Sequence, residues 1–213
     1  MTKYHDVNPQ IITYVHQNIL PIYDSFDNAH NREHVDRVIK NSLSIAKDYC
    51  VDIDKVYVTA AYHDVGLSQG REDHERHSAI YLLADFKLNK WFSVDDMVLI
   101  SEAIEDHRAS NIQEPRNIYG KIVSDADRDL DYTMVLNRVI RYSLEYFPSY
   151  TPEEHFNRTY LHIQDKCGEN GYLKIWLDTE PNRSNLMKIR NALSDPDRFK
   201  ADFMRIFKSG EVY

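Results

Sequence analysis

The sequence predicts an all-α protein. Its 213 residues contain only 6 Gly and 7 Pro, so turn signals are widely spaced. The segments between these signals carry apolar residues at three- and four-residue spacing, which is typical of amphipathic helices. No stretch alternates with period two over the length of a strand, apart from short ambiguous runs such as 56–58. We therefore expect a bundle of helices.

Five helices are predicted in the first 127 residues. Asn31 is a good N-cap for the first helix, and Ser93, followed by two acidic residues, is a good N-cap for the fourth. Gly66 can end the second helix, because glycine adopts the backbone conformations found just after helices. Pro115 suits the first turn of the fifth helix, where no N–H donor is needed. In chain order these helices cover about 31–49, 54–66, 74–86, 93–107 and 115–126.

Four further helices are predicted in the rest of the chain. The first of them ends where Phe147 precedes Pro148, because proline cannot continue a helix. Thr151 and Glu154 form a capping-box pattern that begins the next one. The dipeptide Asp195-Pro196 divides the last helical region in two. These helices cover about 131–146 and 151–167, with two more between 181 and 208.

The length and composition fit one domain. With 42 % hydrophobic and 28 % charged residues, the chain can bury a core of useful size without disulfides. We expect a single helical domain over residues 1–213, with a C-terminal helical extension at about 150–210. Cys50 and Cys167 lie far apart and outside any paired motif, so neither a disulfide framework nor a cysteine-based zinc site is expected. The oligomeric state stays open, a homo-oligomer included.

Charge and hydropathy argue against two classes of partner. The net charge is −8 and no Lys/Arg cluster occurs, so we expect no binding to nucleic acid through its phosphate backbone. No apolar run approaches the roughly 18 residues that a membrane span needs. The first ten residues are polar and contain Pro9, unlike a signal peptide of the usual kind. We expect a cytoplasmic protein without membrane contact.

Two histidines and two aspartates on three predicted helices are candidate metal ligands. His34 lies on an apolar helical face, the pair His63-Asp64 lies near the end of its helix, and Asp127 follows Val123 by one turn. Each has a simpler explanation when taken alone: a core histidine, a helix-terminal histidine with a capping aspartate, and a solvated acidic helix end. Together they form a mixed nitrogen and oxygen set suited to Mn, Mg, Fe, Ni, Co or Zn.

The segments around these four residues resemble the HD-domain superfamily of metal-dependent phosphohydrolases. They occur in the family's order and at compatible spacing, and the resemblance covers roughly residues 10–145. It implies a phosphodiesterase-like helical bundle, one divalent metal ion held by the four residues, and hydrolysis of phosphoesters or phosphoanhydrides. The pattern is nearest to small stand-alone HD hydrolases, some of which act on nucleotides. The three segments are His34–Val38, Ala61–Gly66 and Ile122–Asp131.

Two more histidines are candidates for a second metal ion or for phosphate contact. His74 and His107 lie in segments that resemble the two additional histidine segments of the family's two-metal members. Both are equally compatible with exposed surface histidines. No Gly-Tyr-Pro follows His107, so the resemblance to cyclic-dinucleotide phosphodiesterases is weak. The acidic pair Glu72-Asp73 lies farther from the His-Asp pair than in the alarmone hydrolases.

The expected reaction is attack of water on phosphorus. A bound divalent ion lowers the pKa of a bound water and neutralises charge that builds on the phosphate oxygens. Asp64 would orient this water, with Glu72 or Asp73 as the alternatives. We expect a small phosphorylated metabolite as the substrate, with nucleotides first, because Tyr62 directly precedes His63 and offers a ring for stacking a base.

Three basic residues are candidates for phosphate contact. Arg37 lies one turn after His34, and arginine is well shaped for bidentate phosphate contacts. Lys121 and Arg128 follow in order of preference, and surface solvation is the alternative for all three. His30 precedes His34 by four residues and would share its helical face, as a group that supports the ligands or contacts substrate.

Two other functions fit the same residues. One is a non-catalytic nucleotide-binding regulatory module, which would bind ligand without turnover. The other is a di-iron oxygenase, which would show a visible absorption band and consume oxygen. The intact four-ligand set favours the hydrolase, because a pure binding module has no need of an activated water.

Overall fold

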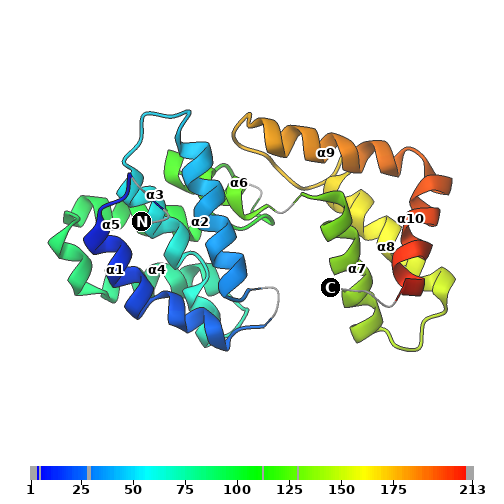
Figure 1. Cartoon of the computed structure of the whole chain (residues 1–213), viewed down its shortest axis with the longest axis horizontal. Helices are drawn as coiled ribbons and strands as arrows, with labels where there is room; N and C mark the ends of the chain where they lie inside the picture. Colours follow the sequence, from blue (N-terminus) through cyan, green and yellow to red (C-terminus); the bar gives the residue numbers. More distant parts are fainter. Residues whose placement is uncertain (1–3, 5, 28–29, 112, 129, 210–213) are drawn as a thin grey trace. The chain divides into compact units, whose positions relative to one another are not determined.

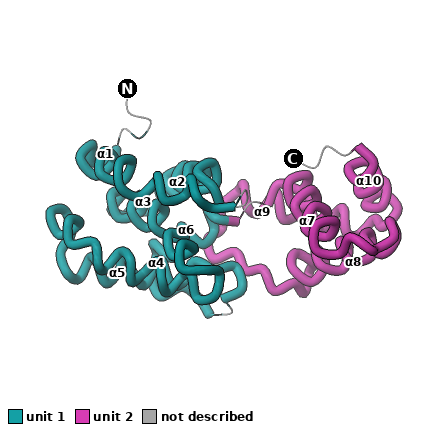
Figure 2. The backbone as a smooth tube through the Cα atoms, turned by 90° about the horizontal axis from the view of Figure 1, so that it is seen from below, with its two compact units in different colours: residues 1–127 teal, residues 128–213 magenta. Residues whose placement is uncertain are grey.

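The computed structural model is all-α over the residues that it describes, namely 4, 6–27, 30–111, 113–128 and 130–209 (Figure 1). Within these residues it contains ten α-helices, three short 3-10 helices and no strand, which confirms the predicted fold class. The chain divides into two compact units, Met1–Asp127 and Arg128–Tyr213 (Figure 2). The single domain over 1–213 stays a prediction, and each unit is described below by itself.

The described part of the first unit contains six α-helices and three 3-10 helices. The α-helices are α1 (Pro9–Asn18), α2 (Arg32–Ala46), α3 (Ile53–Tyr62), α4 (His74–Ala84), α5 (Val94–Glu105) and α6 (Ile118–Asp127). The 3-10 helices are η1 (Leu20–Ser25), η2 (Val65–Gln69) and η3 (Phe86–Lys90). In the part of the chain that the structure covers, no helix has both the length and the hydropathy that a bilayer span requires.

Helix α3 lies in the core of this unit. All its side chains from Val56 to Tyr62 are buried, and α1, α2, α5 and α6 pack against it. A helix that is buried on every side is surrounded by other helices. Helix α3 is therefore the central helix of this unit. His63 directly follows the last residue of α3 and is fully buried. The C-terminal end of α3 thus places polar side chains inside the unit.

Several predicted helix starts are confirmed by their caps. The side chain of Asn31 accepts the backbone N–H groups of Glu33 and His34 at the start of α2. Ser93 forms a capping box with Asp96 at the start of α5. Such caps satisfy backbone donors that the helix itself leaves unpaired, so they are among the helix features most readable from sequence.

Three predicted boundaries are wrong. Helix α3 ends at Tyr62, four residues before Gly66, because the chain turns there into η2. Helix α6 begins at Ile118, so Pro115 lies before the helix and not in its first turn. Helix α2 ends at Ala46 rather than near Tyr49.

The helices α1 and η1 have no counterpart among the sequence predictions. Asn8 caps α1 by accepting the N–H of Gln10, and Pro9 follows in the first turn. Ile11, Val15 and Leu20 on these elements are fully buried. Helix α1 is short and amphipathic, and packing of its apolar side chains stabilises it more than its intrinsic helix propensity does. A helix of this kind is difficult to predict from the sequence.

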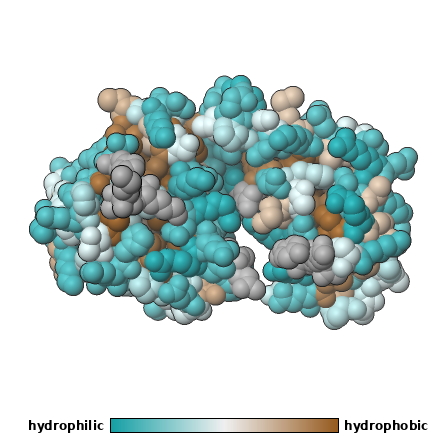
Figure 3. Space-filling model, in the orientation of Figure 1, coloured by the Kyte–Doolittle hydropathy of each residue, from teal (hydrophilic) through white to brown (hydrophobic). Residues whose placement is uncertain are grey.

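In its described residues, the second unit contains four helices with an aromatic core. Rings of Phe156 and Tyr160 pack edge-on against Phe199, with centroid distances of 6.3 and 5.2 Å, and Phe156 also meets Phe203 at 5.5 Å. These contacts join α8 to α10. The face drawn in Figure 3 is mostly hydrophilic, in line with the 28 % of charged residues. The helices are α7 (Tyr132–Tyr146), α8 (Pro152–Cys167), α9 (Glu180–Leu193) and α10 (Pro196–Ser209).

Candidate metal centre

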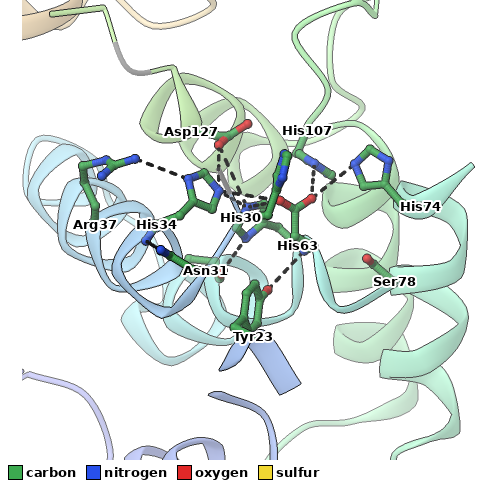
Figure 4. A network of polar contacts seen from close by, with 12 residues as sticks. Tyr23, His30, Asn31, His34, Arg37, His63, His74, Ser78, His107 and Asp127 are labelled. Carbon is green, nitrogen blue, oxygen red and sulfur yellow. Dashed lines mark hydrogen bonds and ion pairs between the residues drawn. The ribbon is translucent and has the colours of Figure 1, made fainter. Parts of the chain in front are cut away.

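Three helices of the first unit bring polar side chains together at one end of α3. His34 lies in the first turn of α2, His63 and Asp64 follow the last residue of α3, and Asp127 is the last residue of α6. Figure 4 shows His34, His107 and Asp127 gathered around His63. All of these residues lie at or close to a helix end, and α2, α5 and α6 pack against α3.

A first cluster consists of His34, His63 and Asp127. The Nε2 atoms of the two imidazoles lie 3.2 Å apart, and the Nε2 of His34 lies 3.3 Å from Asp127 Oδ1. His63 Nε2 lies 4.0 Å from the same oxygen. The three ligand atoms lie within 4.8 Å of one another, so a single cation between them would contact all three.

A second cluster consists of Asp64, His74 and His107. Asp64 Oδ1 lies 3.2 Å from His74 Nε2 and 3.4 Å from His107 Nε2. The other oxygen, Oδ2, lies 3.3 Å from His63 Nε2 and 3.6 Å from His34 Nε2. The carboxylate of Asp64 therefore joins the two clusters, with one oxygen directed to each.

The imidazoles are already oriented as metal ligands. The Nδ1 atoms of His63, His74 and His107 lie 2.8, 3.1 and 2.6 Å from the carbonyl oxygens of Ala60, Arg71 and Ile104, in each case three residues earlier. A carbonyl oxygen only accepts hydrogen bonds, so each Nδ1 carries the proton. Each Nε2 then faces the clusters, and once its own proton is lost it offers a metal ion the lone pair that coordination requires.

The charges in the centre favour a cation. Burial would raise the pKa of Asp64, but the facing imidazoles, above all His63, hold that pKa well below its usual range. Burial would lower the pKa of His63, yet Asp64 and Asp127 together raise it to about 9. Without a metal ion, imidazole protons thus supply the positive charge that the buried carboxylates need.

A divalent ion fits these residues. Asp64 Oδ1 is buried and forms no hydrogen bond of good geometry within the described residues, although two imidazole nitrogens face it. A buried carboxylate oxygen in this state is costly, and a cation removes the cost. The donor set of imidazole nitrogens and carboxylate oxygens suits the transition metals and zinc.

The buried Tyr23 on η1 supports the centre and is not found by sequence reasoning. Its hydroxyl donates to the carbonyl of Ala61 over 3.0 Å and accepts the N–H of Asp64 over 3.2 Å. It therefore fixes the backbone that carries the bridging carboxylate. No local pattern points to this role, because Tyr23 lies 41 residues before Asp64 in the sequence.

Two charged residues that sequence reasoning also missed hold His74. Glu75 Oε2 lies 3.3 Å from His74 Nδ1, and the Arg108 guanidinium donates to Glu75 over 3.1 Å. Arg108 directly follows His107, so one ion pair links the segments that carry both histidines of the second cluster. The sequence offers one signal for this role, because Glu75 directly follows His74 and Arg108 directly follows His107.

The phosphate-contact candidates differ in their placement. Arg37 Nη2 lies 3.5 Å from His34 Nδ1, beside the first cluster. The structure does not bring Lys121 there, because its ammonium forms an ion pair with Glu114. Arg128 is buried and begins the second unit, so its contact with phosphate stays a prediction.

Other candidates lie at the edge of the centre or outside it. The ring of His30 lies 5.8 Å from that of His34, and its Nδ1 lies 2.8 Å from Asp27 Oδ1. Glu72 and Asp73, the alternative acids for orienting water, are exposed. The expectation that Tyr62 stacks on a base is wrong: its ring is fully buried in the core, and its hydroxyl donates to Asp85 over 2.7 Å.

Gly66 determines how closely η2 approaches α4. Its N–H donates to Ser78 Oγ over 2.8 Å, and a Cβ at this position would overlap the backbone of His74 and Ser78. We expect Gly66→Ala to destabilise the protein by about 1–3 kcal/mol, as overpacking does, and to displace His74. Urea unfolding and bound-metal content measure the two effects. The exposed neighbour Ser68→Ala should change stability by less than about 0.5 kcal/mol, and equal effects of the two substitutions would contradict the account.

Comparison with known proteins also supports a metal centre in the first unit. Residues 31–130 match the HD domain. No curated protein matches the chain. A solved structure from Lactobacillus plantarum is similar at 20 % identity and a TM-score of 0.62, and the match covers 93 % of this chain and 99 % of that one. At this identity the likeness shows the fold alone.

A second solved structure is a predicted HD superfamily hydrolase from an uncultured Thermotogales bacterium. It is 20 % identical, with 96 % of this chain and 94 % of that chain covered and a TM-score of 0.49. The HD-domain match covers every residue of the two clusters. The HD-domain match and the two clusters together support a metal-dependent hydrolase.

Proposed function

We propose that this chain, whose residues 31–130 match the HD domain, is a phosphohydrolase whose two clusters would hold two divalent ions, one on each side of the carboxylate of Asp64. His34, His63 and Asp127 would hold one ion with Oδ2 of Asp64, and His74 and His107 would hold the other with Oδ1. The observation that carries the proposal is this division of one buried carboxylate between two sets of imidazoles.

The reaction that suits such a site is hydrolysis of a phosphoester or phosphoanhydride. When bound, divalent ions supply a water of lowered pKa and offset the charge on the phosphate oxygens. The chain itself contributes orientation: the backbone carbonyls hold three imidazole rings, and Tyr23 holds the peptide of Asp64. Ligands held this way need no rearrangement during the reaction, which is the basis of electrostatic preorganisation.

Arg37 is the residue that we assign to the substrate phosphate. It is half-buried, and its Nη2 lies 3.5 Å from Nδ1 of His34, beside the first cluster. A phosphate oxygen bound at the first cluster would be within reach of this side chain, and arginine binds phosphate through two parallel N–H groups.

We expect Arg37→Ala to act mainly on substrate affinity. Loss of a charge-assisted hydrogen bond costs roughly 1.5–3 kcal/mol, which corresponds to a fall in kcat/KM of roughly 10- to 150-fold. Steady-state kinetics with metal-loaded protein measure this. Lys40→Ala, on an exposed position of the same helix, is the matched control and should leave KM unchanged. An Arg37→Ala enzyme with wild-type kcat/KM would remove Arg37 from the substrate site.

A small phosphorylated metabolite, with nucleotides first, is the proposed substrate class. The metal-stripped protein is reloaded with Mn, Mg, Ni, Co or Fe and offered nucleotides, phosphomonoesters and cyclic nucleotides, and release of phosphate or pyrophosphate is measured. We expect release that depends on added metal. Tight nucleotide binding without release under every metal would instead support the binding module, and oxygen consumption with iron would support the oxygenase.

A further inference from the structure

The second unit contains a cavity between α7 and α8. Its volume is about 290 Å³, close to the lower limit of the roughly 300–1,000 Å³ found for small-molecule sites. All of its described lining residues belong to the second unit, whereas every residue of the two metal clusters belongs to the first. Part of the lining is apolar and includes Val135, Val139 and Ile163. The cavity is thus suited to the apolar part of a small molecule.

The remaining lining is basic. Four of the described lining residues have basic side chains, and none of the described lining residues is Asp or Glu. This local charge is opposite in sign to the net charge of −8 of the whole chain. Charge complementarity therefore favours an anion over a cation or a neutral ligand. The four residues are Arg138, Arg158, His162 and Lys166.

Arg158 is held in a fixed position. Its guanidinium lies 4.9 Å from the ring centre of Tyr142 and 4.7 Å from that of Phe147. Its Nη1 is buried and has no hydrogen-bond partner within the residues that the structure covers. A buried donor without an acceptor is unfavourable, and an anionic oxygen in the cavity would supply the acceptor.

The pKa of His162 is consistent with a positively charged cavity. Partial burial, and then the positive charges of Lys166 and Arg158, lower the pKa of its imidazole. Arg138 and Lys166 have other interactions, so the proposal rests on Arg158 and His162. Both of these side chains come from α8, one turn apart, and both line the cavity.

We propose that this cavity binds a small organic anion whose acidic group is carried on an apolar body, as in a medium-chain carboxylate. The valine and isoleucine side chains cover the apolar body, and Arg158 with His162 contacts the acidic group. Such a ligand combines the two features of the lining, since neither an inorganic anion nor an uncharged alcohol uses both. This site is independent of the proposed phosphohydrolase activity.

Isothermal titration of the full chain with octanoate tests the proposal. We expect saturable binding of one octanoate per chain, with octylammonium, of the same length but opposite charge, at least about tenfold weaker. Acetate serves as a carboxylate without an apolar body and should bind at least about tenfold more weakly than octanoate. Equal affinity for octanoate and octylammonium, or for octanoate and acetate, would overturn the proposed ligand class.

Variants locate the binding at the cavity. Arg158→Gln should weaken octanoate binding at least about fivefold. Val139→Phe fills the cavity without changing its charge and should abolish binding. Arg205→Gln is the matched control, because Arg205 is exposed on α10, pairs with Asp202 and lies outside the lining. Octanoate binding that survives Val139→Phe unchanged would overturn the proposal.

An NMR titration gives a local readout that does not depend on these substitutions. The imidazole of His162 faces Arg158 and Lys166 as positive groups, and Asp165 as a negative one. A carboxylate bound beside it adds negative charge, so octanoate should raise the pKa of His162, and octylammonium should not. A pKa of His162 that is unaffected by saturating octanoate would contradict the placement.

Discussion

Asp64→Asn should lose metal from both clusters and lower kcat by more than about 10⁴-fold. Asparagine has nearly the shape of aspartate but no negative charge, and Asp64 directs one oxygen to each cluster. Each tenfold loss of rate corresponds to about 1.36 kcal/mol of barrier, and an ion is worth several kcal/mol of charge stabilisation. Metal analysis after desalting and steady-state kinetics measure the two losses.

The Asp64→Asn substitution should leave the fold intact. Tyr23 holds the peptide of Asp64 through the backbone N–H, a contact that the side-chain change does not touch. Helical content by circular dichroism should therefore stay at the wild-type value. Asp95→Asn, at an exposed aspartate on α5 that lies outside both clusters, should retain metal and activity. An Asp64→Asn protein with the full wild-type complement of metal would refute the shared carboxylate.

His107→Gln should remove one ion and leave the other. His107 is buried, and its Nε2 lies 3.4 Å from Asp64 Oδ1, the oxygen that His74 also faces. Loss of one of two ions should lower kcat by roughly 100- to 1,000-fold, since an ion contributes several kcal/mol. Metal stoichiometry and kcat are measured on the same preparation.

A second histidine substitution controls for the loss of an imidazole as such. His16 is exposed on α1 and lies outside both clusters, so His16→Gln should keep the wild-type stoichiometry and kcat. If His107→Gln also keeps both values, His107 is a structural residue at this position. If it loses both ions, the two clusters do not fill independently, and the one-ion form that we expect does not exist.

The sequence predicts the elements of this fold where a local rule decides them. The caps at Asn31, Ser93 and Thr151 satisfy backbone donors within three residues, so they are legible without tertiary structure. The end of α3 is different. Tyr62 ends it because the chain turns into η2 to place Gly66 against α4, and this packing is not encoded in the helix itself.

The candidate site also contains residues that the sequence predicts and residues that only the structure shows. The residues of the clusters lie in three motif segments and two histidine segments, so their identity is accessible from sequence. Their partners depend on contacts between distant segments, as with Tyr23 and Asp64 or Arg108 and Glu75. Tyr62 is the opposite case, since its ring is adjacent to His63 in sequence but packs into the core. Adjacency places the backbone, whereas packing decides which way the side chain points.

Calorimetric titration of the metal-stripped wild-type protein with Mn tests the two-ion site most directly. Two clusters joined by Asp64 predict two ions per chain, a value that His107→Gln reduces to one and Asp64→Asn to none. Binding of a single ion by the wild type, unchanged in His107→Gln, would contradict the shared carboxylate and leave only the cluster of His34, His63 and Asp127.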